Sequence, residues 1–194
     1  AVSPAGGNLK EPVTESTKKA ARCFYALSQS RADSKRYPAV DPIDSYSKYL
    51  EYDEVIENLK KNVGENWLDN LLYAKNLLVR GKEAYEQINI LGDDGVPVDY
   101  HVRFWKSEVF DFVILQQDAF DEVDASTPID RQKFMMDLVI GIVQDEYDFE
   151  SFEEVNAYFR GLINILKQMN YSEFESDDFK KFESQLKEEL EKKK

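Results

Sequence analysis

The sequence is poor in the residues from which many small catalytic sites are built. Its 194 residues contain one cysteine and one histidine. Cys23 alone cannot form an internal disulfide or a thiolate metal cage, so we expect a small buried side chain in a reducing compartment. His101 alone cannot supply a histidine metal site or a serine–histidine or cysteine–histidine pair, so we expect a surface or packing role. We therefore predict no metal site.

Long apolar runs and an excess of positive charge are also missing. No apolar stretch reaches the roughly 18 to 20 residues that span a bilayer, and the first residues lack the pattern of a signal peptide. Thirty-eight acidic and 25 basic residues give a net charge of −13, which repels phosphate backbones and anionic membranes. The sequence predicts a soluble, cytoplasmic protein without direct membrane insertion, which binds no nucleic acid and favours a basic partner surface.

A phosphate-binding loop is absent as well. The one Gly-Lys pair, Gly81 and Lys82, has Asn76 where a Walker A loop needs glycine and Glu83 where it needs a hydroxyl. The acidic runs 118–124 and 145–154 lack the order of a calcium loop, and we interpret them as solvated helix starts. No residue of this chain is therefore predicted to be catalytic.

Two regimes of sequence meet near residue 45. Residues 1–45 hold four of the six prolines, one expected strand at about 21–27 and one expected short helix at about 29–36. A lone strand cannot satisfy its own backbone donors and acceptors. We expect this segment to be a small α/β remnant of a larger sheet domain.

Residues 46–194 follow a helical period instead. Breaks are expected near Gly64, at 92–97, at 124–128 and near Asn170. The fold class predicted is mainly α, with an antiparallel C-terminal helical bundle. The apolar stripes are Leu68, Leu71, Leu72, Leu78, Tyr85, Ile88 and Leu91; Val102, Trp105, Val109, Phe112 and Val113; Met135, Leu138, Val139, Ile142 and Val143; Val155, Tyr158, Phe159, Leu162, Ile163, Leu166 and Met169; and Phe179, Phe182, Leu186 and Leu190.

Specific motifs narrow the interpretation. SPAGGNLKEPVT (3–14), CFYALSQSRADSKRYPAVDPIDSYSKYL (23–50) and ILQQDAFDEVD (114–124) resemble, in order and spacing, the catalytic A subunit of V/A-type rotary ATPases. The ending MNYSEFESDDFKKFESQLKEEL (169–190) is similar to the last helix of that subunit. The resemblance covers nearly the whole chain. It implies that residues 1–45 end a nucleotide-binding domain and that residues 46–194 form its C-terminal helical domain.

The resemblance also implies an adenine site. In that family an aromatic residue before a Pro-Ala pair and a phenylalanine after a Gln-Gln pair form the walls of the pocket, which maps onto Tyr37 and Phe120. Stacking of a base on an aromatic ring is worth about 1 to 3 kcal/mol per contact. Pro38 stiffens the backbone at Tyr37. The amides of Gln116 and Gln117 either meet the adenine edge or cap the preceding helix.

A second implied site is a turn that contacts the rotor. A Leu-Gly step, Leu91 and Gly92, comes before DDGVPVD, and acidic side chains there would meet basic residues of the central shaft. Without the resemblance, the same residues would be interpreted only as an exposed interhelical turn. The residues implied in rotor contact are Asp93, Asp94, Gly95, Val96, Pro97 and Asp99.

Rotary coupling of ATP hydrolysis or synthesis to H⁺ or Na⁺ transport is the function that the resemblance implies. The full-length subunit would bind ATP or ADP with Mg²⁺ between A and B subunits, with its phosphate-binding lysine, metal site and water-activating carboxylate upstream of residue 1. This chain alone is expected to be inactive. Two alternatives stay open at this point, namely a non-catalytic B-type subunit and a stand-alone acidic helical scaffold that binds a basic helix.

Overall fold

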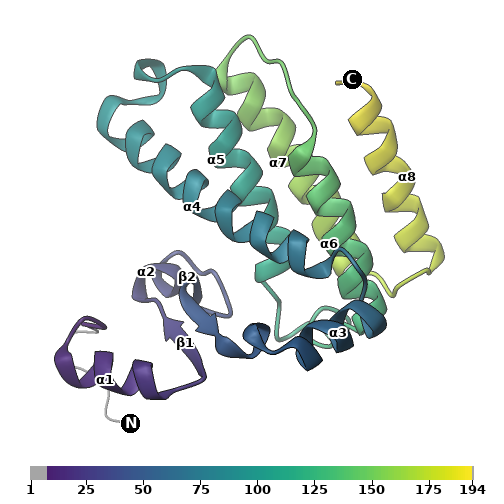
Figure 1. Cartoon of the computed structure of the whole chain (residues 1–194). Coiled ribbons are helices and arrows are strands. Elements are labelled where there is room, and N and C mark those ends of the chain that lie inside the picture. The colour runs from purple at the N-terminus through teal and green to yellow at the C-terminus, as the bar shows by residue number, and fades with distance from the viewer. Residues whose placement is uncertain (1–7, 194) are drawn as a thin grey trace.

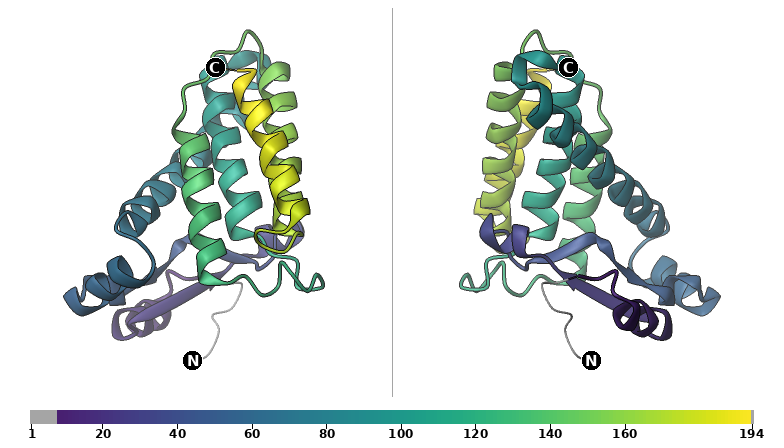
Figure 2. Two further views of the ribbon diagram at one scale, coloured as in Figure 1. Left: turned by 90° about the vertical axis from the view of Figure 1, so that its right-hand side faces the viewer. Right: turned by 90° about the vertical axis from the view of Figure 1, so that its left-hand side faces the viewer.

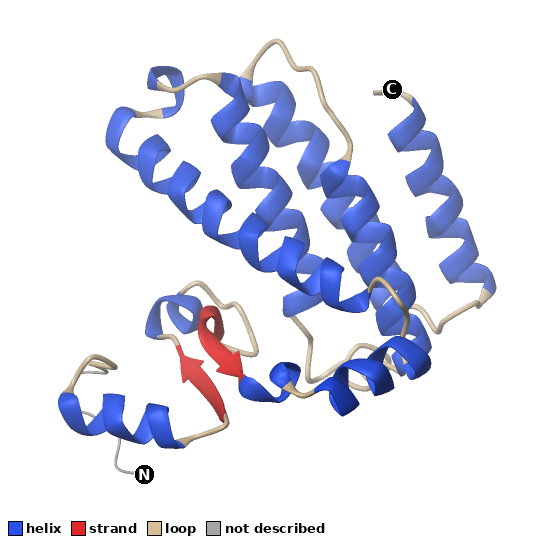
Figure 3. Ribbon diagram, viewed as in Figure 1, coloured by secondary structure: helices blue, strands red, loops and turns tan. Residues whose placement is uncertain are grey.

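Helices of alternating direction make up most of the molecule, and a two-stranded sheet lies at one end of them (Figure 1, Figure 3). The computed structural model describes residues 8–193. The expectation of a mainly α fold with a small α/β portion is confirmed. Both views of Figure 2 place the sheet at the end of the bundle where α5 (Val98–Phe110) ends and α6 (Ile129–Gln144) begins.

The N-terminal portion contains more structure than the sequence predicts. It consists of α1 (Pro12–Ala20), β1 (Cys23–Leu27), α2 (Gln29–Asp33) and β2 (Val40–Ser47). Helix α1 was not expected. Residues 1–7, which carry most of the SPAGGN motif, lie outside the described residues.

The expectation of a lone strand is wrong, because β2 pairs with β1 in antiparallel register. The pairing joins Phe24 to Tyr46 and Ala26 to Asp41, so β2 bulges between these two points. Pro42 lies in the bulge, where its missing N–H costs no ladder hydrogen bond. The bulge hides the period of two by which a strand is recognised, and it also contains the expected domain boundary near residue 45.

The helical portion breaks where the sequence predicts. The breaks at 92–97 and 124–128 and near Gly64 and Asn170 all fall between helices. Each of the long helices runs opposite to the one before it (Figure 1). The remaining elements are η2 (Lys48–Glu51), α3 (Asp53–Asn62), α4 (Trp67–Leu91), η3 (Asp93–Gly95), η4 (Asp111–Leu115), α7 (Phe152–Asn170) and α8 (Asp177–Glu191).

Helix α7 lies at the centre of the core. All seven residues of its predicted stripe are buried, and so are Phe179 and Leu186 of α8. The stripes of α5 and α6 are mostly buried against them. Serine caps begin α7 and α8, since Ser151 accepts from the backbone N–H of Glu154 and Ser176 from that of Phe179. No helix in the described part of the chain has the length and apolar character needed to cross a membrane.

The stripe expected on α4 is confirmed only in part. Leu71 and Leu78 pack against the core, but most of the fully buried residues of α4 are small ones. Leu72, Tyr85 and Leu91 are exposed. The buried residues of α4 are Ala74, Leu77, Gly81 and Ala84. A Cβ added at Gly81 would lie 1.9 Å from the hydroxyl oxygen of Ser107, so α4 approaches α5 too closely for any larger side chain.

The expectation that Cys23 is a buried side chain also fails, because Cys23 is only half-buried in β1.

Candidate functional site

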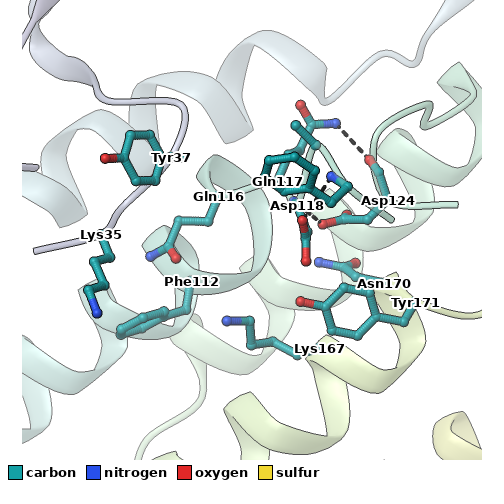
Figure 4. A pocket seen from close by; sticks show the side chains of 12 residues that line it. Lys35, Tyr37, Phe112, Gln116, Gln117, Asp118, Asp124, Lys167, Asn170 and Tyr171 are labelled. Carbon is teal, nitrogen blue, oxygen red and sulfur yellow. Dashed lines mark hydrogen bonds between the residues drawn. The ribbon is translucent and has the colours of Figure 1, made fainter. Parts of the chain in front are cut away.

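A pocket of about 450 Å³ opens between the segment after α2 and the far end of α5 (Figure 4). Its volume lies within the range of roughly 300 to 1,000 Å³ that is typical of small-ligand sites. Tyr37 and Phe120, far apart in the sequence, both line it. Lys35, Phe112, Gln116 and Lys167 line it as well.

Tyr37 reaches the pocket because α2 ends abruptly. Lys35 adopts a left-handed conformation with φ of 56°, and the N–H of Arg36 donates to the carbonyl oxygen of Arg31 at 2.8 Å. This arrangement closes a helix and turns the chain away from it. The carbonyl oxygen of Tyr37 then accepts from the N–H of Gln117 at 2.9 Å, while its ring stays 54% exposed. A backbone hydrogen bond therefore joins the two segments that carry the predicted walls.

Phe120 stands on a loop that its aspartates fold. The carboxylate of Asp118 accepts from the N–H of Phe120 at 2.9 Å, and that of Asp121 accepts from the N–H groups of Val123 and Asp124. The carboxylate of Asp124 accepts from the N–H of Asp118 at 2.6 Å, which closes the loop. Our interpretation of this acidic run as a helix start is wrong, because the carboxylates cap the loop backbone instead.

The ring of Phe120 is 99% exposed. Burial is the common use of a phenylalanine, and an exposed ring held by an ordered loop offers both its faces to a partner or ligand. The structure thus brings Tyr37 and Phe120 to one pocket, and their role in stacking adenine stays a prediction.

The two glutamines differ in what their amides do. The side-chain nitrogen of Gln117 donates to the carbonyl oxygen of Asp124 at 3.1 Å, so this amide stabilises the loop that carries Phe120. The side-chain nitrogen of Gln116 is buried and has no hydrogen-bond partner in the described structure. Figure 4 shows the Gln116 amide between Tyr37 and Phe112. A buried donor without a partner is costly, and a ligand in the pocket would satisfy it.

Gln116 owes its position to the π-helical turn η4, which continues α5. The N–H of Gln116 donates to the carbonyl oxygen of Asp111, five residues earlier. Such turns insert one extra residue into a helix and occur often at functional sites. The apolar spacing of the sequence gave no signal for it.

A buried arginine that sequence reasoning missed contacts the backbone of Asn170, which lines the pocket. Arg131 is 1% exposed, and its guanidinium donates to the carbonyl oxygens of Val123, Met169 and Asn170. These contacts hold the end of α7 against the loop that carries Phe120. Burial lowers the pKa of Arg131 and raises the pKa of Asp124. Nothing in the sequence marked it, because its neighbours Asp130, Gln132 and Lys133 are polar as well.

A second polar cluster, which we call the arginine clamp, consists of Arg31, Arg36, Glu108 and Asp111. Arg31 donates to both carboxylate oxygens of Asp111 at 3.0 and 2.7 Å. Arg36 donates to both oxygens of Glu108 at 2.9 and 2.7 Å and to Asp111 at 2.5 Å. The bonds to Glu108 raise the pKa of Arg36. Its guanidinium carbon also lies 4.8 Å from the ring centroid of Phe112, which lines the pocket.

The predicted rotor-contact turn lies at the opposite end of α5 from the pocket (Figure 1). His101 is buried, its Nε2 lies 3.1 Å from the carbonyl oxygen of Asp93, and its ring stacks on Phe152. The packing role expected for the histidine is therefore confirmed. Of the residues predicted to contact a rotor, Val96 is buried and does not face solvent. Asp93, Asp94, Gly95, Pro97 and Asp99 are exposed.

Metal ligands are not gathered anywhere in residues 8–193. No group of three or more His, Cys, Asp or Glu side chains there is arranged to hold an ion.

Curated relatives of this chain include V-type ATP synthase alpha chains. No protein-family model matches the chain. It is 36% identical over 187 residues to the V-type ATP synthase alpha chain of Protochlamydia amoebophila, a match that covers 96% of this chain and 31% of that protein. It is 40% identical over 181 residues to the protein of the same name from Chlamydia muridarum, covering 93% of this chain and 30% of that protein.

A solved structure shares the fold. The ATP synthase subunit NeqB from Nanoarcheaum equitans superimposes with a TM-score of 0.56 at 18% identity, over 74% of this chain and 33% of that one. At this identity the likeness concerns the fold alone. The sequence relatives, at much higher identity, carry the alpha-chain name and thereby favour the A-type interpretation over the B-type subunit and the stand-alone scaffold. The chain, which spans less than a third of these relatives, therefore corresponds by sequence to the C-terminal part of the V-type ATP synthase alpha chain.

Proposed function

We propose that this chain supplies the adenine slot and the rotor-contact turn of the catalytic subunit of a V/A-type ATP synthase. The full-length subunit would bind ATP or ADP with Mg²⁺ and couple its hydrolysis or synthesis to rotation and to H⁺ or Na⁺ transport. The observation that carries the proposal is that Tyr37 and Phe120 line the same pocket, together with Gln116, whose side-chain nitrogen has no hydrogen-bond partner in the described structure.

The chemistry of the pocket suits a purine base. Two aromatic rings can stack on its faces, and the Gln116 amide can donate to a ring nitrogen at its edge. The cations of Lys35 and Lys167 at the pocket favour an anionic ligand. With no phosphate-binding loop in the chain, stacking and these few polar contacts must offset the whole cost of association. We therefore expect weak nucleotide binding by this chain alone.

The turn at 93–99 suits a partner with both basic and apolar groups. Asp93 and Asp94 are exposed at its tip. Ile90 and Leu91, at the adjoining end of α4, are 73% and 57% exposed. Charged groups at the rim of an interface favour encounter, whereas apolar groups at its centre favour a lasting contact. The partners proposed are the central rotor shaft for this turn and B subunits for the nucleotide-binding end, in a complex peripheral to the membrane.

Photolabelling tests the adenine slot. Irradiation of the chain with 2-azido-ATP at high concentration should attach label to Tyr37 or to the peptide that contains Phe120. Tyr37→Ala should remove most of the labelling, because one wall of the slot is lost. Tyr25→Ala is the matched control, since Tyr25 is a tyrosine of the same N-terminal portion with 72% exposure and lies outside the pocket. Labelling spread evenly over the surface, or unchanged in Tyr37→Ala, would contradict the slot.

Phosphate release tests the division of labour. The purified chain should release no phosphate from ATP above a buffer blank, because it contains no Walker A loop. The full-length subunit assembled with its partners should hydrolyse ATP, and Tyr37→Ala should raise its KM for ATP with a smaller change in kcat. A KM unchanged by this substitution would contradict a role for Tyr37 in binding the base.

A further inference from the structure

One helix joins the two proposed sites. Helix α5 and its continuation η4 span residues 98–115 without a break, a length of about 27 Å at 1.5 Å per residue. At its start, His101 contacts the backbone of Asp93 in the turn. At its end, Phe112 and Gln116 line the pocket. A displacement of this helix therefore displaces both sites.

The arginine clamp attaches Tyr37 to the same helix. Arg36 directly precedes Tyr37, and its side chain holds Glu108 of α5 through two hydrogen bonds and Asp111 through a third. Arg31 donates to both oxygens of Asp111 and shares one of them with Arg36. The four side chains carry two positive and two negative charges, and each is 23% exposed or less. Paired forks of this kind fix orientation as well as distance, and they are screened little by salt when buried.

Without the clamp, few polar bonds would tie the N-terminal segment to α5 and η4. The backbone bond from Gln117 to Tyr37 would remain, and the covalent connection runs through η2. The distribution of polar bonds therefore indicates that the clamp, and not the chain connection, sets the position of Tyr37 relative to α5.

We propose that Arg31 and Arg36 are positioning residues. Through their bonds to Asp111 and Glu108 they fix the segment that bears Tyr37 to helix α5, so that the segment and the helix move together as one rigid body. The base slot then travels with the turn at 93–97 when the bundle moves. The boundary expected near residue 45 is then not a hinge, because the clamp joins the segment before it, which bears Tyr37, to α5 and η4 after it. This inference rests on the proposed function for the identity of the two sites, and its structural claim stands without it.

Distance measurements between two spin labels by pulsed electron paramagnetic resonance test the structural claim in this chain. Spin labels at Asp44→Cys in β2 and Lys180→Cys in α8, with Cys23→Ser, should give one narrow distance. Glu108→Gln and Asp111→Asn remove two charges of the clamp and leave its buried guanidinium groups without a charged partner. The equilibrium should shift toward release of the N-terminal segment from α5 by on the order of tenfold or more. The expected result is loss of the single narrow distance.

A matched control removes the same charges elsewhere. Glu183→Gln and Asp137→Asn break exposed pairs with Lys187 and Lys133 on α8 and α6. The narrow distance should persist, since exposed pairs contribute little. Should the clamp variant fail to fold, Arg36→Lys keeps the charge but cannot hold Glu108 and Asp111 together, and it should broaden the distance as well. A folded clamp variant that keeps the narrow distance would overturn the proposal.

The functional arm uses the full-length subunit in its assembled complex. Glu108→Gln with Asp111→Asn should lower the number of ions transported per ATP hydrolysed, while the control pair leaves that ratio unchanged. A merely structural defect would reduce ATP hydrolysis and transport together and leave the ratio intact, which would overturn the positioning role. Because the spin-label experiment contains no nucleotide and the photolabelling experiment leaves the clamp intact, failure of the proposed function and failure of this inference give different results.

Discussion

At the scale of single residues, Gly81 decides how closely two helices approach. A Cβ at this position would lie 1.9 Å from the hydroxyl oxygen and 2.2 Å from the Cβ of Ser107. Gly81→Ala should therefore lower the free energy of unfolding by about 1 to 3 kcal/mol, as overpacking does. Urea denaturation measures the change.

Two further variants give the substitution its controls. Gly141→Ala on α6 meets no atom within 4 Å, and it should stabilise the protein by about 0.5 to 1 kcal/mol because alanine favours the helix interior. Ser107→Gly combined with Gly81→Ala should recover part of the loss by removing the colliding atoms. If Gly81→Ala and Gly141→Ala behave alike, the close approach of α4 and α5 is wrong.

Asp124 predicts a pH dependence at the floor of the pocket. Burial raises its pKa above the ordinary value of 3.8. Between that value and the raised pKa, the folded protein holds a proton that the unfolded chain has released, so the contribution of Asp124 to stability falls as pH rises. Asp124→Asn keeps an oxygen that can accept from the N–H of Asp118 and does not ionise.

The stability of Asp124→Asn relative to the natural sequence should therefore increase as pH rises through this window. Urea denaturation of both proteins at a series of pH values gives the difference. A difference that is constant with pH, or that shrinks as pH rises, would show that burial does not control this carboxylate.

At the scale of elements, the contact between His101 and the turn η3 predicts how firmly the turn is held. His101→Phe keeps a ring that can stack on Phe152 but loses the hydrogen bond to the carbonyl oxygen of Asp93. Since a hydrogen bond contributes about 0.5 to 1.5 kcal/mol, amide exchange at Gly95 should speed up by roughly threefold to tenfold.

Hydrogen exchange followed by mass spectrometry or NMR gives the measurement. The N–H of Gly95 donates to the carbonyl oxygen of Gly92 within this turn, so it reports directly on turn opening. Amides of α7 supply the internal control. Equal exchange at Gly95 in both proteins would mean that the turn is held by its own backbone and not by the histidine.

The elements that the sequence predicts well are those whose contacts are made by large apolar side chains. Helix α7 buries its whole stripe, and its spacing alone identifies it. Helix α4 is predicted only in part, because three of its four buried residues are alanine or glycine, whose low hydrophobicity hides them from a pattern of large side chains. Strand β2 fails because its bulge places Pro42 within the run and breaks the alternation.

The candidate site was predictable only in part, for related reasons. Tyr37 and Phe120 could be named from motifs, and the structure brings them to one pocket. The arginine clamp could not, because its pairs join positions more than seventy residues apart and nothing local marks them. The free amide of Gln116 was also unpredictable, since it depends on a π-helical turn that the apolar spacing does not reveal.

At the scale of the whole molecule, the net charge of −13 predicts a response to salt. Like charges repel one another in the folded state, and salt screens that repulsion. Raising NaCl from about 10 mM to about 150 mM shortens the screening length from roughly 30 to 8 Å. The midpoint of thermal unfolding should therefore rise.

Calorimetry at the two salt concentrations measures the shift. The clamp works in the opposite direction, because screening weakens attractive pairs, but its burial limits that loss. A midpoint that falls with salt would show that attraction between paired side chains outweighs the general repulsion.

The π-helical turn has a consequence for how this chain tolerates insertion and deletion. Each residue of a regular helix advances by about 100° around the axis, so losing the one extra residue of η4 would restore an ordinary ladder. The buried face of α5 before the turn would keep its phase. The chain after it, beginning with Gln116, leaves the helix in an extended conformation and would then leave it from a changed position. A loss of a single residue here would therefore leave the bundle packed and yet redirect the lining of the pocket.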